Sequence, residues 1–152
     1  MKRIASFDVD HRTITEGMYI SRIDGDVVTY DLRMKKPNQG DLLSNSEMHS
    51  LEHMFATVVR NSALGDKVIY FGPMGCQTGF YLLMRHDNHQ ENLALVKEVL
   101  RKVMDYDGEM PGNSEIECGN YRSLNMPLAK EAARRYYEAI KDKTVEDMRY
   151  TK

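Results

Sequence analysis

Two stretches near the N-terminus, residues 18–23 and 27–34, are rich in β-branched and aromatic residues. Runs of this composition are typical of strands, and the Asp24-Gly25-Asp26 sequence between them indicates a β-hairpin. The next stretch, residues 35–46 (KKPNQGDLLSNS), is rich in turn-forming residues and is predicted to be a loop.

A helix is predicted to follow this loop, with Asn45 or Ser46 as its N-cap, and to run to about Leu64, where Gly65 ends it. Apolar residues within it recur at spacings of three and four, which places them on one face of the helix. These residues are Met48, Leu51, Phe55 and Val58. We expect this face to be buried.

The second half of the chain contains two further predicted strands and a second predicted helix. The strands cover residues 67–71 and 78–85 and flank the loop GPMGCQTG. The helix, capped by Asn88 or His89, runs to about residue 106, with Gly108 beyond its end. Its predicted inward positions are Leu93, Val96, Leu100 and Val103.

The last predicted helix follows Asn125, has Pro127 in its first turn and ends at Ile140, and Thr144 caps a final short turn. The resulting order, β-β-α-β-β-α-α, lacks the regular alternation of a doubly wound fold. It predicts an α+β fold with a mostly antiparallel sheet. Because the sequence contains no internal repeat or linker, residues 1–152 are predicted to form a single domain.

The composition is that of an ordinary globular protein, with 41% hydrophobic and 29% charged residues and a net charge of −2. Neither a basic run nor a membrane-spanning segment occurs, so we expect no nucleic acid and no membrane as partner. Asp8 and Asp10 precede any apolar stretch long enough for a signal peptide, which predicts a cytoplasmic protein. In such a protein Cys76 and Cys118 are expected to be free or metal-bound thiols rather than a disulfide.

The pentapeptide HSLEH carries two histidines four positions apart. On a helix, His49 and His53 lie on one face about 6 Å apart along the axis and can direct their rings at one ion, although such pairs also occur by chance. Glu52 lies on the same side, where it can act on a bound water or substrate. The order H-x-x-E-H is that of the inverted zincins, and it indicates a related metallohydrolase-like fold.

Two histidines rarely suffice for a metal, and the two cysteines are the remaining soft ligands, suited to zinc or ferrous iron. If both cysteines bind, the site is a closed Cys2His2 site that only stabilises the fold. If one binds, an open position remains for water or substrate, as in a catalytic site. The local sequence favours Cys118 (SEIECGN) as the ligand and Cys76 (PMGCQTG) as an acid/base group or nucleophile.

These motifs resemble the S-ribosylhomocysteine lyase family, bacterial enzymes that make the autoinducer-2 precursor of quorum sensing. The resemblance rests on SFDVDH (6–11), YDLR (30–33), PN (37–38), HSLEH, PMGCQTGFY and ECG, and it covers most of the chain to about Gly119. It implies cleavage of S-ribosyl-L-homocysteine to L-homocysteine and 4,5-dihydroxy-2,3-pentanedione. In this reaction the carbonyl migrates from carbon 1 to carbon 3 of the ribose through enediolates, and β-elimination then expels the homocysteine thiol.

The resemblance also assigns roles to individual residues. His49, His53 and Cys118 would hold one divalent metal per subunit, natively Fe2+, with Zn2+ or Co2+ as substitutes and with no organic cofactor. Glu52 and Cys76 would transfer protons, Cys76 in the first isomerisations and Glu52 in the later steps and the elimination. This inventory agrees with the chemistry, because proton abstraction beside a carbonyl needs a Lewis acid and flanking acid/base groups.

Ser6, His11 and Arg33 match positions that line the substrate pocket of the family, where Arg33 would stabilise charge. Without the resemblance, Ser6 is equally a turn cap, His11 a surface residue and Arg33 an exposed strand residue paired with Asp31. Family members are homodimers with active sites at the subunit interface and with helices on one side of a mostly antiparallel sheet. We therefore expect a homodimer of this architecture.

The chain departs from the family pattern at several positions. Tyr70 stands where an acidic residue, thought to meet the substrate's amino group, is usual, and Gly72 stands where serine is usual. Ser114 and Glu117 replace a common asparagine and glutamine. These changes leave the metal and acid/base groups intact and concern the recognition of the homocysteine end.

Two other functions stay open on the sequence. An inverted-motif metallopeptidase would use Glu52 to activate a metal-bound water, but the chain has no extended substrate-binding domain, and a thiolate ligand is unusual in that class. A non-enzymatic module with a closed Cys2His2 site predicts that Cys76→Ala loses the metal and unfolds. The lyase hypothesis predicts that the same variant keeps the metal and loses turnover.

Overall fold

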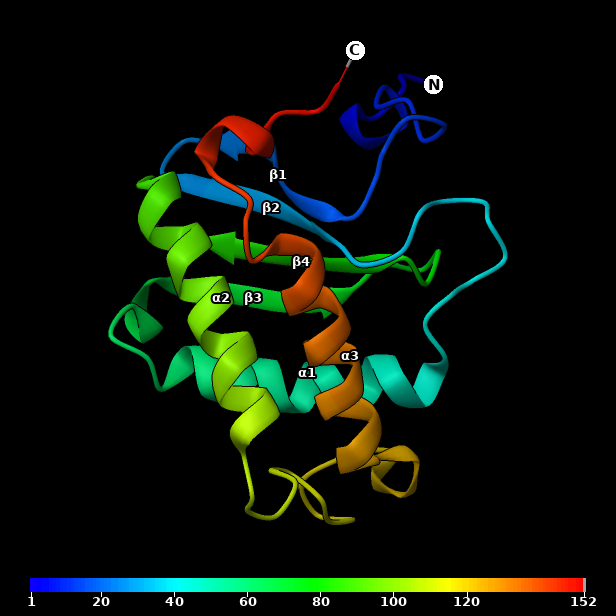
Figure 1. The fold of residues 1–152 in the computed structure, drawn as a ribbon, viewed down its shortest axis with the longest axis vertical. Helices are drawn as coiled ribbons and strands as arrows, with labels where there is room; N and C mark the ends of the chain where they lie inside the picture. Colours follow the sequence, from blue (N-terminus) through cyan, green and yellow to red (C-terminus); the bar gives the residue numbers. More distant parts are fainter. Residues whose placement is uncertain (152) are drawn as a thin grey trace.

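The computed structural model describes residues 1–151, and a four-stranded antiparallel sheet lies at its centre (Figure 1). The strands are β1 (Gly17–Asp24), β2 (Val27–Arg33), β3 (Val68–Pro73) and β4 (Gly79–Met84), in the spatial order β1-β2-β4-β3. The predicted strands are confirmed, with ends that differ by one or two residues. The predicted α+β class with an antiparallel sheet is confirmed as well.

Glycine and proline mark the strand ends for identifiable reasons. Gly25 in the β1–β2 turn has a φ of +61°, the left-handed conformation that this tight turn requires. Gly79 opens β4 directly against β2, and a Cβ there would overlap the carbonyl oxygen of Leu32. Pro73 can end β3 because β3 is an edge strand, where a residue without an N–H group leaves no partner unpaired.

Helix α1 (Asn45–Arg60) starts earlier than predicted and ends four residues earlier. Its N-cap is Ser44, whose hydroxyl accepts from the Glu47 N–H while the Glu47 carboxylate accepts from the Ser44 N–H, at 3.1 and 3.0 Å. This capping box excludes the predicted caps one and two residues later. The predicted C-terminus is wrong because the chain turns back across the helix end, where a Cβ on Gly65 would overlap the Arg60 carbonyl oxygen.

The remaining helices match their predictions. Helix α2 (His89–Asp105) has Asn88 as its N-cap, helix α3 (Met126–Ile140) has Asn125, and a final short helix covers Val145–Met148. Each asparagine accepts from the backbone N–H three residues further on, at 3.0 Å. Among residues 1–151, no helix combines the length and the apolar character needed to cross a membrane.

The three α-helices lie on one face of the sheet, as predicted (Figure 1). Alternate residues of the central strands point into this helical layer and are at most 1% exposed; they are Val28, Tyr30, Leu32, Phe80, Leu82 and Met84. Phe71 stacks between Phe55 of α1 and Phe80 of β4, with ring centroids 4.2 and 4.6 Å apart. This packing fixes α1, and with it both histidines of HSLEH, relative to the sheet.

The sheet face that points away from the helices differs from the helix-covered face. The N-terminal segment and the C-terminal residues lie near each other on the β1 side of the molecule (Figure 1). Asp31 and Arg33 of β2 point to this face, since they alternate with the helix-facing residues of the same strand. Polar side chains are thus held on the sheet away from the helices.

Candidate metal centre and active site

Helix α1 and the loop before α3 bring three metal-ligating side chains together. Ligand atoms of His49, His53 and Cys118, hereafter the metal group, all lie within 4.8 Å of one another. The two histidines are one turn apart on α1, with ring centroids 4.7 Å apart and ring planes at 90°. The cysteine, 69 positions after the first histidine, comes from the loop that follows α2.

Hydrogen bonds orient both imidazole rings. The Nδ1 atom of His53 lies 2.8 Å from the carbonyl oxygen of Pro111, which only accepts, so this nitrogen carries the proton. The Nδ1 atom of His49 lies 2.6 Å from Ser123 Oγ, whose own proton goes to the carbonyl oxygen of Asn120. The Nδ1 atom of His49 is therefore also a hydrogen-bond donor. Both rings present an unprotonated Nε2, the atom that can bind a metal.

The Cys118 sulfur completes the metal group. Its Sγ lies 3.3 Å from His49 Nε2 and accepts the backbone N–H of Asn120 at 3.4 Å. Burial and, after it, the neighbouring His53 lower the pKa of His49, so this ring is neutral and available as a ligand at pH 7. Gly112, at φ +69°, would place a Cβ 3.0 Å from His53 Nδ1, so the loop against this ring needs glycine.

The donor set fits a divalent transition metal, because neutral imidazoles and a thiolate suit zinc and ferrous iron. Among the residues that the structure describes, the metal-competent cluster holds His49, His53 and Cys118 and does not include Cys76. Both cysteines are free, as predicted. Three protein ligands leave a coordination position for water or substrate, which favours the catalytic arrangement over the closed Cys2His2 site.

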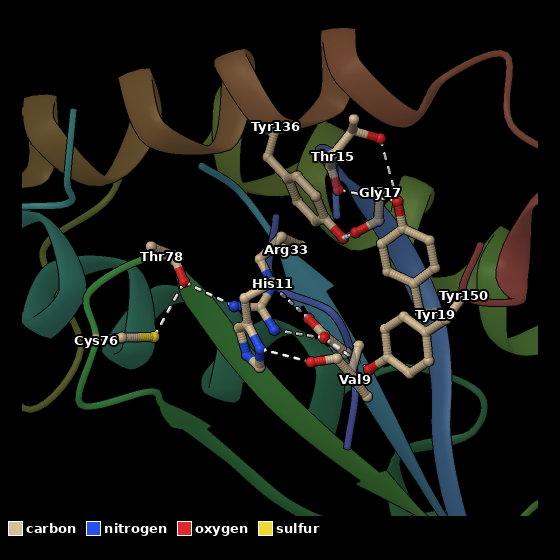
Figure 2. A network of polar contacts seen from close by, with 11 residues as sticks. Val9, His11, Thr15, Gly17, Tyr19, Arg33, Cys76, Thr78, Tyr136 and Tyr150 are labelled. Carbon is tan, nitrogen blue, oxygen red and sulfur yellow. Dashed lines mark hydrogen bonds and ion pairs between the residues drawn. The ribbon is translucent and has the colours of Figure 1, made fainter. Parts of the chain in front are cut away.

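Cys76 belongs to a second cluster, the thiol group, formed by Arg33, Thr78 and Cys76 at neighbouring ends of β2 and β4 (Figure 2). The Cys76 sulfur lies 3.0 Å from Thr78 Oγ1, and Arg33 Nη1 donates to the same oxygen at 2.8 Å. Arg33 also donates twice to Asp31, at 2.7 and 3.1 Å. Burial opposes the charge of Arg33, but these bonds outweigh it and raise the pKa of Arg33. The pairing with Asp31 is confirmed, whereas an exposed Arg33 is excluded, since its side chain is 3% exposed.

Two further predicted site residues, Glu52 and His11, lie on different parts of the fold. Glu52 is partly buried on α1, one position before His53, so the helix carries it beside the metal group. His11 lies in the N-terminal segment, with Nδ1 2.9 Å from the carbonyl oxygen of Val9 (Figure 2). Among residues 1–151, no hydrogen bond or ion pair joins the metal group to the thiol group. One chain thus carries two separate clusters of predicted active-site residues.

Ser6 and Tyr70, one of the departures from the family pattern, line the same hollow. Its volume is about 400 Å³, and Ser6, Tyr70 and Tyr81 are among its lining residues. The Tyr70 ring lies over Gly72, where a Cβ would overlap the Tyr70 hydroxyl. The departures at positions 70 and 72 are therefore coupled, because a serine at position 72 would collide with the present position of the Tyr70 ring. Within the described part of the chain, the charged residue that lines the hollow is Arg22.

Sequence reasoning missed several residues of the site. Ser123 and Pro111 orient the two histidines across 74 and 58 positions of sequence, and nothing local to either residue signals this contact. Thr78 is different, because it stands within the PMGCQTG motif two positions after Cys76. Its closeness to the thiol was therefore available from the sequence.

Comparisons with known proteins cover nearly the whole chain. The model of the family described as S-Ribosylhomocysteinase (LuxS) matches residues 4–147. The chain is 41% identical over 153 residues to the S-ribosylhomocysteine lyase of Clostridium acetobutylicum, covering 97% of this chain and 96% of the relative. It is 42% identical over 157 residues to that of Phocaeicola vulgatus, covering 99% and 98%, and 42% identical over 152 residues to that of Desulfotalea psychrophila, covering 96% of each. The chain belongs to the S-ribosylhomocysteinase family.

Proposed function

We propose that this protein cleaves the thioether of S-ribosyl-L-homocysteine and releases L-homocysteine and 4,5-dihydroxy-2,3-pentanedione. The observation that carries the proposal is the metal group, which has three ligands in a chain similar over nearly its full length to named S-ribosylhomocysteine lyases. The thiolate ligand argues against the inverted-motif metallopeptidase. The absence of Cys76 from the cluster within residues 1–151 argues against the closed structural module.

His49, His53 and Cys118 would hold the divalent metal, which we propose is Fe2+ in the cell, with Zn2+ or Co2+ able to substitute. When bound, such an ion supplies a Lewis acid that stabilises negative charge on a sugar oxygen. The contribution of the protein is orientation, because Ser123 and Pro111 hold the two imidazoles with their Nε2 atoms toward the site.

The acid/base groups of the chain move the protons. As a thiolate, Cys76 takes a proton from the carbon next to the sugar carbonyl and returns it to the former carbonyl carbon, while the proton of the neighbouring hydroxyl passes to the former carbonyl oxygen. Two such isomerisations move the carbonyl from carbon 1 to carbon 3. Thr78 contacts the sulfur and Arg33 donates to Thr78, so the Thr78 hydroxyl and the positive charge behind it stabilise the thiolate. Glu52 then removes the proton α to the shifted carbonyl. The electron pair left on carbon 4 forms a double bond to carbon 5 as the bond from carbon 5 to sulfur breaks, and the homocysteine sulfur takes up a proton. The resulting enol then tautomerises to the dione.

Ser6, His11 and Arg33 are proposed to contact the substrate. Ser6 lines the open hollow on the outer sheet face, and the guanidinium of Arg33 has N–H groups left over after its bonds to Asp31 and Thr78. These donors suit the hydroxyl and carboxylate groups of a sugar joined to an amino acid.

The active enzyme is proposed to be a homodimer with its sites at the subunit interface. Two observations support this proposal. The metal group and the thiol group share no polar contact among residues 1–151, and the outer sheet face presents an apolar hollow. Its lining includes Tyr81 and Leu83 as well as Ile4 and Tyr70, which are 55% and 54% exposed. A second copy would cover this face and bring the thiol group of one copy toward the metal group of the other.

Three predictions from the sequence remain predictions. They are a cytoplasmic location, the use of the product as an autoinducer-2 precursor, and the organisation of residues 1–152 as one domain.

Release of free thiol tests the proposed function. Protein purified without oxygen and loaded with iron or cobalt is mixed with S-ribosylhomocysteine, and free thiol and the dihydroxypentanedione are measured. We expect both products in equal amounts, and no product after the metal has been removed by a chelator. Metal-loaded protein that releases neither product from this substrate would contradict the proposal.

A further inference from the structure

A buried ion pair on the outer sheet face is the starting point. Asp31 and Arg33 are 1% and 3% exposed although the helices cover the other face of β2. A buried carboxylate needs donors for several lone pairs, and Arg33 supplies two N–H groups at 2.7 and 3.1 Å. A further donor comes from an unexpected direction, the C-terminal end of the chain.

Tyr150, just beyond the last short helix, provides this donor. Its hydroxyl donates to Asp31 Oδ2 at 2.7 Å, the same oxygen that accepts from Arg33 Nη2 (Figure 2). The Tyr150 ring stacks on Tyr19 of β1, with centroids 5.0 Å apart and planes at 19°. Burial and, after it, the charge of Asp31 raise the pKa of Tyr150, so its hydroxyl stays protonated and remains a donor.

From Arg33 the hydrogen bonds lead to the Cys76 sulfur in a fixed order. A guanidinium only donates, so Thr78 Oγ1 accepts from Arg33 Nη1 at 2.8 Å. A thiolate only accepts, so the 3.0 Å contact between Thr78 Oγ1 and a deprotonated Cys76 must use the single hydroxyl proton of Thr78. The chain of contacts is therefore Tyr150 to Asp31, Arg33 to Asp31, Arg33 to Thr78, and Thr78 to Cys76.

The other titratable side chains in this region are His11, whose Nδ1 lies 2.9 Å from the Val9 carbonyl oxygen (Figure 2), and three tyrosines. Tyr81 on β4 pairs in register with Asp31, and burial followed by the Asp31 charge raises its pKa. Tyr136 on α3 donates to the Gly17 carbonyl oxygen at 2.8 Å, and burial raises its pKa well above the usual value. Tyr19 donates to the carbonyl oxygen of Thr15 at 2.9 Å. Through Thr78, the hydrogen bonds link the Cys76 sulfur to the buried Asp31–Arg33 ion pair.

We propose that Tyr150 is a positioning residue for Cys76. By donating to the Asp31 oxygen that also accepts from Arg33 Nη2, its hydroxyl fixes the carboxylate and with it the plane of the guanidinium, and the guanidinium in turn directs the Thr78 hydroxyl at the sulfur. Without this donor the carboxylate pairs more strongly with the guanidinium and draws it away from Thr78. The thiolate of Cys76 then loses support from both Thr78 and the positive charge of Arg33. The consequence for turnover, unlike the positioning itself, rests on the proposed lyase function.

Alkylation of Cys76 tests the proposal without any lyase activity. Metal-loaded wild-type protein and Tyr150→Phe are treated with iodoacetamide across a range of pH, and the modified Cys76 peptide is quantified by mass spectrometry. Tyr150→Phe keeps the ring stacked on Tyr19 and removes only the hydroxyl. We expect roughly 3- to 10-fold slower alkylation at pH 7 and a pH midpoint higher by about half a unit to one unit, because the lost bond is to a charged group.

Two further substitutions make the test specific. Tyr19→Phe removes a hydroxyl from the same tyrosine stack without touching Asp31, and its alkylation profile is expected to match the wild type. Thr78→Val breaks the contact next to the sulfur and is expected to slow alkylation more than Tyr150→Phe does, whereas Thr78→Ser is expected to restore the wild-type profile. A wild-type profile in Tyr150→Phe, or an equal shift in Tyr19→Phe, would overturn the proposal.

Lyase kinetics on the same proteins separate the two proposals. If both hold, Tyr150→Phe lowers kcat by about the same factor as alkylation and leaves KM nearly unchanged. If the wild type shows no lyase activity but the alkylation shift appears, the proposed function fails and the positioning role stands. If the wild type is active but Tyr150→Phe alkylates normally, the positioning role fails and the lyase stands. A lower thermal midpoint with a normal alkylation profile would assign Tyr150 a merely structural role and also overturn the proposal.

Discussion

The metal group and the thiol group are held in place by opposite physical means. In the metal group, the two imidazole rings donate neutral hydrogen bonds, His49 to Ser123 and His53 to Pro111, and these bonds orient the rings. In the thiol group, a buried ion pair lies one side chain away from the sulfur. The first arrangement is prepared to receive a cation, and the second is prepared to hold an anion.

The metal affinity of one group and the thiol reactivity of the other therefore respond to different substitutions. Metal affinity depends on how well neutral ligands are aimed, so distant loop residues that make no contact with the ion control it. The reactivity of the thiol depends on nearby charge, so residues of the sheet and its cover control it. A change in one group is therefore expected to leave the other group's property unaltered.

Loss of a metal ligand has the largest expected effect. If it changed the reactivity of Cys76 as well as metal binding, the two groups would not be independent. Cys118→Ala removes the one sulfur of the metal group. We expect the variant to lose its metal during dialysis and to lose lyase activity roughly 10³-fold, because a Lewis acid contributes several kcal/mol. Alkylation of Cys76 should be unchanged. Elemental analysis measures the bound metal, and Glu117→Gln, a change at the exposed neighbouring residue, serves as control. A Cys118→Ala variant that keeps its metal would contradict the assignment of Cys118 as a ligand.

Loss of an orienting hydrogen bond is expected to have an intermediate effect. Ser123→Ala removes the acceptor that holds His49 Nδ1 at 2.6 Å and leaves every ligand in place. Metal affinity should fall roughly 10- to 100-fold, as is usual when a partner of a ligating histidine is lost. Titration against a competing chelator measures this change. Ser114→Ala serves as control, since that serine bonds to Glu117 in the same part of the chain. An unchanged affinity in Ser123→Ala would show that the ring needs no such support.

The smallest expected effect concerns substrate recognition at the hollow on the outer sheet face, which Ser6 and Tyr70 line. Tyr70→Asp introduces the acidic residue that the family usually carries at this position. We expect KM for S-ribosylhomocysteine to fall by roughly 5- to 10-fold through a charge-assisted bond to the substrate's amino group, with kcat and metal content unchanged. The neutral variant Tyr70→Asn should show no such gain. An equal change in both variants would mean that the tyrosine ring, and not the missing charge, governs recognition.

Local interactions explain which parts could be predicted from the sequence. The β1–β2 hairpin and the N-terminal ends of α2 and α3 depend on residues within a few positions of one another, such as Gly25, Asn88 and Asn125. The C-terminal end of α1 could not be predicted, because the return of the chain at Gly65, and not the helical periodicity, decides where the helix stops.

In the candidate site, too, features set by local sequence could be predicted, whereas features set by distant contacts could not. The HSLEH histidines could be placed on one face of a helix because that spacing is local. The contact of Tyr150 with Asp31 spans 119 positions and that of His49 with Ser123 spans 74, so the partners that orient the site residues carried no sequence signal. The family resemblance supplied Cys118 as the third ligand, and the structure brings it to the two histidines.

Metal content and turnover of Cys76→Ala, measured on one preparation, test the central claim most directly. The claim is that the metal group binds the ion without Cys76, while the thiol group performs proton transfer. It predicts the metal content of the wild type, a free energy of unfolding changed by no more than about 0.5 kcal/mol for this exposed side chain, and no detectable thiol release. Loss of the metal and of the fold together with this one sulfur would contradict the claim and restore the closed Cys2His2 site.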